Sequence, residues 1–214
     1  MPHVVHTNVY QLNELAPPAQ DKARDWYREL IETEEWSEGV TEDFEEVCKI
    51  LGVRLRTRPV QLYGGGTRGK PCIWFRGFSS QGDGACFEAD YAFAKDAPRR
   101  LRAHAPKDSE LHAIADLLLK LQRRNFYQLS ASIAHSGRTY HENTMHIVVD
   151  RAGPRDQRMT DDAEEGVAEA LRDLARWLYR QLESAYDYAV SDASVDETIL
   201  ANEYTFTAAG RRFG

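Results

Sequence analysis

Apolar residues recur at every third or fourth position in four long segments, a spacing typical of amphipathic helices. Each segment follows a residue that favours the start of a helix, either a proline of the first turn or a side chain that can cap it. A shorter fifth helix is expected from residue 191 to about residue 202. The residues that begin or cap these five helices are Pro17, Thr41, Asp108, Thr160 and Ser191.

Between these helices, apolar and polar residues alternate with the period of two that marks a half-buried strand. Such runs cover residues 53–57 and 87–93, and the apolar run of residues 72–75 is expected to be a further strand. The connections between them are too short for a crossover helix, so we expect an antiparallel meander.

A second strand pair is expected from residues 127–133 and 145–149, with a turn around residues 136–138. Their apolar faces meet only if the numbers of opposed residues have an even sum, and a three-residue turn would place Ile133 opposite His141. The elements together predict a single α+β domain over residues 1–214, with an antiparallel sheet of about five strands packed with four to five helices. A helical subdomain over residues 154–202 is the alternative division.

The composition is that of an ordinary globular chain, with 42% hydrophobic and 29% charged residues. No apolar run approaches the ~20 residues that cross a bilayer, and the first ten residues lack the features of a secretory signal. Three cysteines are too few for a disulfide scaffold. We therefore expect free thiols and a cytoplasmic protein.

Charge is distributed unevenly along the chain. The net charge is −7, but residues 1–52 sum to −8 and residues 53–76 to +6. Arg54, Arg56 and Arg58 alternate with apolar residues and precede Trp74 and Phe75, a combination that could bind single-stranded nucleic acid. An acidic chain is a poor general nucleic-acid binder, so we favour the interpretation that these arginines face the acidic helices of residues 20–46.

The segment from Gly64 to Lys70 matches the phosphate-binding loop of nucleotide hydrolases except at its last position. That position requires a hydroxyl to bind magnesium, and it is occupied by Pro71. A helix should follow the loop, whereas residues 72–75 are strand-like. A glycine-rich hairpin turn is therefore the favoured interpretation.

The segment around Cys86 resembles the nucleophile segment of ovarian-tumour-type cysteine proteases. This resemblance implies a hydrolase that uses Cys86 with a histidine, such as His141, and Asp83. The residues after Cys86 alternate with a period of two, so the helix that would lower the pKa of a thiol is missing from the pattern. A small apolar cysteine in a strand is the favoured alternative.

His135 and His141 fall on the same face of the predicted hairpin, where Asp83, Cys86 or Glu142 could complete a metal site. The spacing of these residues matches no zinc signature. We therefore expect neither a metal nor a cofactor.

Several motifs spread over residues 8–213 resemble those of a family of small bacteriophage and prophage proteins, some of them labelled antitoxins. They read VYQLNEL at 9–15, GFSSQGDGACFE at 77–88, RRNFYQL at 123–129, YHE at 140–142, and YTF with GRRF within 204–213. The resemblance implies an accessory protein, made in a bacterial host, that binds and inhibits a host or phage protein without catalysis.

Two surfaces are expected to make this contact, and the oligomeric state stays open. One is the acidic region, whose charge suits a basic partner, and the other is the glycine-rich centre, where a loop presents polar and aromatic groups. The residues concerned are Glu32, Glu34, Glu35, Trp36 and Glu38 in the first surface, and Phe78, Ser80, Gln81 and Asp83 in the second.

Overall fold

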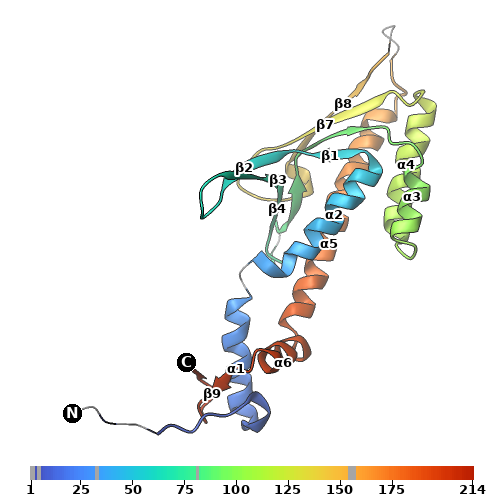
Figure 1. Ribbon diagram of the computed structural model, residues 1–214. Helices are drawn as coiled ribbons and strands as arrows, with labels where there is room; N and C mark the ends of the chain where they lie inside the picture. Colours follow the sequence, from blue (N-terminus) through green and yellow to red (C-terminus); the bar gives the residue numbers. More distant parts are fainter. Residues whose placement is uncertain (1–2, 4–5, 32–33, 81, 154–157) are drawn as a thin grey trace. The chain divides into compact units, whose positions relative to one another are not determined.

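The computed structural model describes residues 3, 6–31, 34–80, 82–153 and 158–214 (Figure 1). The chain forms two compact units, unit 1 of residues 1–39 with 182–214, and unit 2 of residues 40–181. Helices and mainly antiparallel strands make the fold α+β, as the sequence predicts. Among the described helices, none is long and apolar enough to cross a bilayer.

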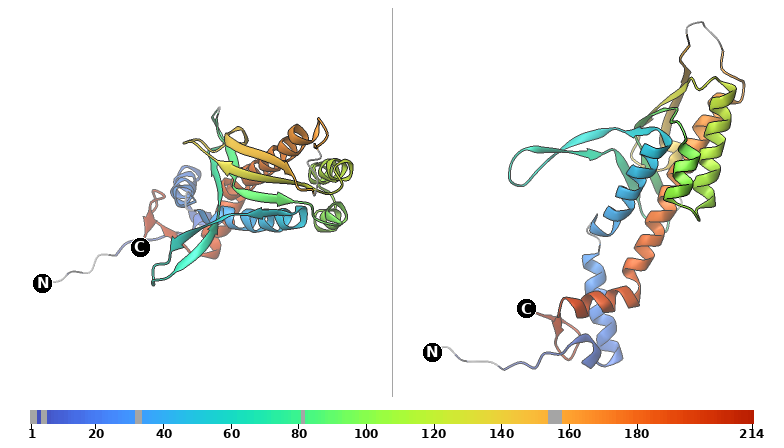
Figure 2. Two further views of the ribbon diagram at one scale, coloured as in Figure 1. Left: turned by 90° about the horizontal axis from the view of Figure 1, so that it is seen from above. Right: turned by 45° about the vertical axis from the view of Figure 1, so that its right-hand side comes forward.

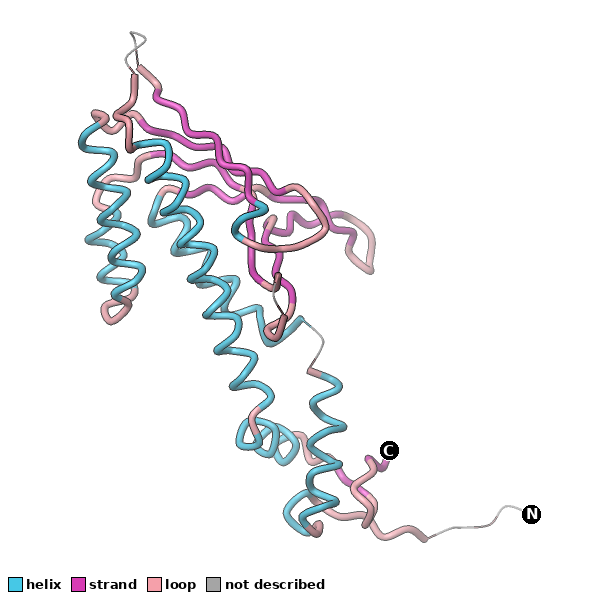
Figure 3. Tube along the Cα trace, turned by 180° about the vertical axis from the view of Figure 1, so that it is seen from behind, coloured by secondary structure: helices cyan, strands magenta, loops and turns pink. Residues whose placement is uncertain are grey.

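Unit 2 is built on a four-stranded antiparallel sheet in the order β1–β6–β7–β8. These strands are Val53–Leu55, Ala89–Ala92, Leu129–His135 and Met145–Arg151. Every second side chain of β7 is buried, at Leu129, Ala131 and Ile133, as expected for a sheet with one covered face. Helices lie along that face, as Figure 3 shows from behind. They belong to α2 (Glu38–Leu51), α4 (Ser109–Arg124) and α5 (Ala163–Val190), and α3 (Ala97–His104) packs against α4.

Aromatic side chains connect the helices of unit 2 to its strands. The ring of Phe44 on α2 lies 5.3 Å from Phe87 of β5 (Gly84–Phe87) and 6.4 Å from Trp177 of α5. The indole N–H of Trp177 donates to Asp108 at 2.7 Å. Asp108 also accepts the backbone N–H of Leu111 at 3.0 Å, which confirms it as the cap of α4.

Two fully buried amide side chains hold the turn between α4 and β7. Gln122 donates to the carbonyl of Leu129 at 2.8 Å and accepts its N–H at 3.1 Å. Asn125 donates to Thr160 at 3.0 Å and accepts its N–H at 2.9 Å. The turn places Phe126 and Tyr127 at φ values of 56° and 61°, a left-handed region that costs energy for residues other than glycine.

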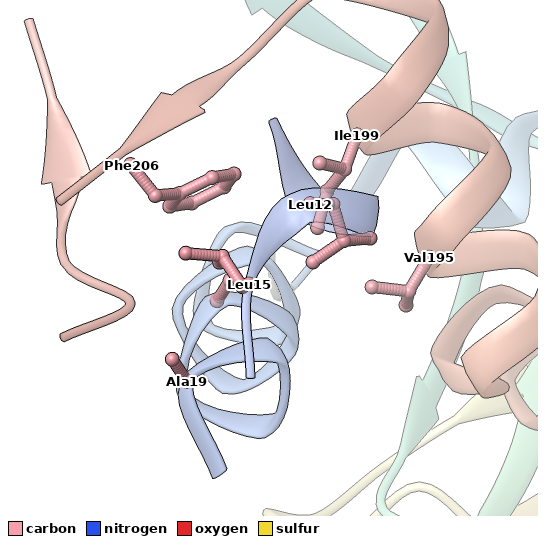
Figure 4. Packing of buried hydrophobic residues seen from close by; sticks show 7 residues of the cluster. Leu12, Leu15, Ala19, Val195, Ile199 and Phe206 are labelled. Carbon is pink, nitrogen blue, oxygen red and sulfur yellow. The ribbon is translucent and has the colours of Figure 1, made fainter. Parts of the chain in front are cut away.

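Unit 1 has its own apolar core, drawn in Figure 4. It joins η1 (Leu12–Glu14), α1 (Pro17–Leu30), α6 (Asp192–Ala201) and the terminal hairpin of β9 (Thr205–Phe206) and β10 (Arg212–Phe213). The guanidinium of Arg24 binds both carboxylate oxygens of Asp196, at 2.7 and 2.8 Å, and so links α1 to α6. The core residues are Leu12, Leu15, Ala19, Ala23, Val195, Ile199 and Phe206.

Three expectations about the elements are wrong. Helix α2 begins at Glu38 rather than after Thr41. The first strands do not form a meander, because β1 pairs with β6. The β7–β8 pair places Ile133 opposite Ile147 rather than His141, since the connection between the strands is longer than three residues. The residue numbers of each opposed pair still have an even sum, so the apolar faces of the two strands lie on the same side of the sheet, as predicted.

Candidate functional site: a projecting hairpin

Three antiparallel strand pairs, one of them part of the four-stranded sheet, meet at Arg56, Cys72 and Glu88. The N–H of Arg56 donates to the carbonyl of Glu88 at 2.8 Å, that of Cys72 to Arg56 at 2.7 Å, and that of Glu88 to Cys72 at 2.9 Å. The strand pairs are β1–β6, β2 (Thr57–Gln61) with β3 (Thr67–Pro71), and β4 (Ile73–Arg76) with β5. This junction directs β2 and β3 away from the four-stranded sheet (Figure 2).

Residues 57–71 form the arm, which comprises β2, β3 and the turn between them. Every residue from 57 to 70 is exposed. Because successive residues of a strand point to opposite faces, the register divides the arm into two different faces. One face carries the opposed pairs Arg58–Lys70 and Val60–Arg68, whereas the other carries Thr57–Pro71, Pro59–Gly69 and Gln61–Thr67. All the charge of the arm therefore lies on one face.

The tip of the arm presents apolar side chains to solvent. Tyr63 is fully exposed, and half of Leu62 is exposed. The N–H of Leu62 donates to Gly66 at 3.1 Å, and the N–H of Gly65 donates to Leu62 at 3.0 Å. Gly65 and Gly66 adopt φ values of 87° and 91°, which explains why glycine occupies them. The segment that imitates a phosphate-binding loop is thus a hairpin, with Lys70 inside a strand.

The three arginines of the predicted basic strand have different surroundings. Arg56 contacts Asp90 of β6 at 2.9 Å, and Arg54 lies 3.6 Å from the same carboxylate. Hydrogen bonding to Arg56 lowers the pKa of Asp90. The guanidinium of Arg58 instead lies 5.7 Å from the ring centre of Trp74, within reach of a cation–π contact. The expectation that Arg54 and Arg56 face the acidic helices of residues 20–46 is wrong, because both lie within 4 Å of Asp90 on the neighbouring strand.

Cys86 is fully buried in β5. Burial raises the pKa of its thiol to about 12, although hydrogen bonds from Thr144 and the His141 backbone act in the opposite direction. A thiol of this kind is almost entirely protonated at neutral pH and is a poor nucleophile. This environment favours the interpretation of Cys86 as a buried strand residue.

The two histidines of the candidate metal site bind polar groups of the protein. The Thr144 hydroxyl lies 3.0 Å from Nδ1 of His135 and donates to the carbonyl of His141 at 2.7 Å. Nδ1 of His141 lies 2.9 Å from Glu142, whose other oxygen lies 3.1 Å from Arg176 of α5. Nε2 of His135 is buried without a partner in the described part of the chain. No group of three metal-binding side chains occurs among the described residues.

The glycine-rich centre is organised by Asp83. Its carboxylate accepts the N–H groups of Ser79 and Ser80 at 3.0 and 2.7 Å, and these bonds lower its pKa. A side chain at Gly77 would collide with this carboxylate at 2.5 Å. Asp83 therefore fixes the loop rather than assisting Cys86, and Gln81 lies outside the described residues.

The remaining expected contact residues are partly packed within their own units. Phe78 lies 5.5 Å from the ring of Tyr179, and Trp36 lies 5.4 Å from Tyr186. Glu38 is exposed at the start of α2, and Ser80 is exposed as well. Glu32 and the side chains of Glu34 and Glu35 lie outside the described part of the chain.

The sequence pattern did not single out Tyr63, which lies on the arm with Arg68 and Lys70 of the basic segment 53–76. A signal for the hairpin was present, because Arg58 precedes the three glycines by six residues, and Arg68 and Lys70 follow them by two and four. Two basic segments on either side of a tight turn must face each other in a hairpin.

Residues 36–192 match the model of a family described as a domain of unknown function, DUF8835. No curated protein and no solved structure matches the chain.

Proposed function

Because the chain belongs to the DUF8835 family, whose name carries no activity, we propose from the site itself that it is a non-catalytic binding protein that contacts a partner protein with the arm. The observation that carries this proposal is the division of the arm into a basic face and an uncharged face, above a tip with a fully exposed tyrosine. A hairpin that buries so little contributes little to folding, and the side chains of Leu62 and Tyr63 at its tip are exposed to a partner.

The chemistry of the arm favours a protein over a nucleic acid. Phosphate groups could contact the basic side chains and bases could stack on Tyr63, but a nucleic acid offers no apolar pocket to Val60 and Leu62. An acidic protein surface with an apolar pocket can bind both the basic and the apolar side chains of the arm. Opposite charge speeds the encounter, and a buried tyrosine anchors the complex. The net charge of −7 also opposes general binding to nucleic acid.

The side chains of the arm support an action by binding alone, in which the chain inhibits its target by covering part of the target's surface. The protonated and buried thiol of Cys86 argues against a cysteine hydrolase. The resemblance to bacteriophage and prophage proteins makes a host or phage protein the proposed target, with the chain acting as an anti-defence inhibitor or as an antitoxin in the bacterial cytoplasm.

The test is capture from lysate of a bacterial host with three forms of the chain. The wild type should retain a protein that co-elutes at a fixed ratio in gel filtration, and the double variant Arg58→Glu/Arg68→Glu should lose it. The variant Arg100→Glu/Lys107→Glu makes the same change in net charge at exposed positions outside the arm and should retain it.

Two results would contradict the proposal. One is equal capture by all three forms, which would place the contact elsewhere. The other is silencing of the captured target by much less than one equivalent, which would indicate catalysis and return attention to Cys86.

A further inference from the structure

We propose that the arm also docks on a second copy of this chain, against the acidic surface of its unit 1. The free protein is then a dimer in which the arms are covered. This inference rests on the proposed function, because it takes the arm as the element that makes contacts.

The two units differ sharply in charge. Unit 1 contains 14 acidic and 5 basic residues, a net charge of −9, whereas unit 2 contains 20 acidic and 22 basic residues, a net charge of +2. Charges of opposite sign on two parts of one chain attract between copies, so every molecule carries both halves of a complementary contact.

Part of the acidic charge of unit 1 is already neutralised. Arg24 and Arg28 pair with the carboxylates of Asp21, Asp25, Asp192 and Asp196. In the described part of the chain, Glu29, Asp187 and Glu197 make no ion pair, and all three are exposed. These three carboxylates are therefore available to the guanidinium groups of Arg58 and Arg68 on an arm.

Apolar side chains accompany the acidic ones. Leu30 follows Glu29 and is 44% exposed, and Tyr188 follows Asp187 and is 66% exposed. On the arm, Val60 and Leu62 are 38% and 50% exposed beside the basic residues. The exposed residues of unit 1 and of the arm thus both include charged and apolar groups, and they differ in the sign of the charge, as the partners of one interface do.

The size of the arm argues for two reciprocal contacts. A strand of five residues spans roughly 17 Å, and a stable interface needs about 800 Å² from each partner. One such ribbon supplies only part of that area, whereas a two-fold pair of chains uses both arms and doubles it. The contact then closes as a dimer and covers the arm, so that a partner protein must displace a second copy.

A charge-swap experiment tests the dimer by sedimentation velocity at about 50 and about 500 mM salt. The wild type should be a dimer that dissociates at the higher salt. The arm variant Arg58→Glu/Arg68→Glu and the unit 1 variant Glu29→Lys/Asp187→Lys/Glu197→Lys should each be monomeric, since each brings like charges together. Their mixture should form a dimer again, because both of its contacts are complementary.

The restored dimer also shows that both variants are folded, and Arg100→Glu/Lys107→Glu, which should stay dimeric, is the matched control. A wild type that is monomeric at low salt, a dimer that ignores the arm variant, or a mixture that stays monomeric would overturn the inference. If a monomeric chain still loses its captured protein on Arg58→Glu/Arg68→Glu, the proposed function stands and only the dimer fails. If the dimer depends on these charges but no protein is captured from lysate, the dimer stands and the proposed function fails.

Discussion

Arg58 and Lys70 stand directly opposite each other across the β2–β3 pair. Like charges in this position destabilise a sheet by about 0.2–1 kcal/mol, and an isolated two-stranded hairpin is only marginally stable. These like charges therefore offset part of the stability that the backbone hydrogen bonds give the arm.

Replacing Lys70 should stabilise the arm and weaken the dimer, so the two effects can be told apart. In the variant Lys70→Glu, an opposite-charge pair replaces the like-charge pair, so the amide groups of residues 57–71 should exchange with solvent several times more slowly when both forms are compared at a concentration too low for the dimer. The dimer should nevertheless weaken, because the basic face loses one of its three charges. Hydrogen exchange and sedimentation measure the two effects, and a variant with faster exchange in the arm would refute the first.

The contact between Arg56 and Asp90 predicts a pH-dependent contribution to stability. The pKa of Asp90 is lowered in the folded chain, so its contribution is present above the unfolded pKa of about 3.9 and is lost as pH falls through the folded-state pKa. The Asp90 side chain is 41% exposed, and screening limits its contribution to less than about 1 kcal/mol.

Accordingly, Asp90→Asn should lower the free energy of unfolding at pH 7 by less than about 1 kcal/mol, and this effect should shrink as pH falls below the unfolded pKa of about 3.9. Urea unfolding at several pH values measures the difference. Asp150→Asn, which removes a carboxylate at an exposed position of β8, serves as the matched control. A difference for Asp90→Asn that does not shrink toward acid pH would exclude the ion pair as its cause.

The Cys86 thiol should be protected from reagents. With a pKa of about 12, only roughly one molecule in 10⁵ carries the thiolate at pH 7, and the side chain is fully buried. Mass spectrometry after maleimide treatment should find Cys86 unlabelled in the native chain and labelled in urea. Rapid labelling of Cys86 in the native chain at pH 6 would instead favour the hydrolase alternative.

The left-handed turn at Phe126 predicts an unusual ranking of two substitutions. Both Phe126→Ala and Phe126→Gly remove the contact of this ring with the guanidinium of Arg151, 5.4 Å away. Glycine alone accepts a φ of 56° without strain, so Phe126→Gly should be more stable than Phe126→Ala by about 1 kcal/mol. Thermal unfolding of the two variants measures the difference, and the opposite ranking would show that the turn relaxes in the variants.

Sequence alone determined the elements whose cause is local. The caps at Asp108 and Ser191 and the prolines of α1 occur where the residue types predict them, because a cap is a contact over three or four positions. The buried face of β7 also follows from alternation, and the hairpin nature of Gly64 to Lys70 follows from Pro71 and the strand after it.

Only the tertiary structure decided which strands pair and which charges stay available for contact. No local pattern distinguishes a meander from three strand pairs that meet at Arg56, Cys72 and Glu88, since Arg56 and Glu88 are 32 positions apart and Val53 pairs with Tyr91 over 38 positions. The three arginines of the basic strand look alike in the sequence. Arg54 and Arg56 lie near Asp90 because its strand lies beside theirs, whereas Arg58 lies beyond the junction, on the arm. The alternation of apolar and polar residues thus determined which face of each strand is buried. Strand pairing over long sequence distances determined which residues lie beside each strand.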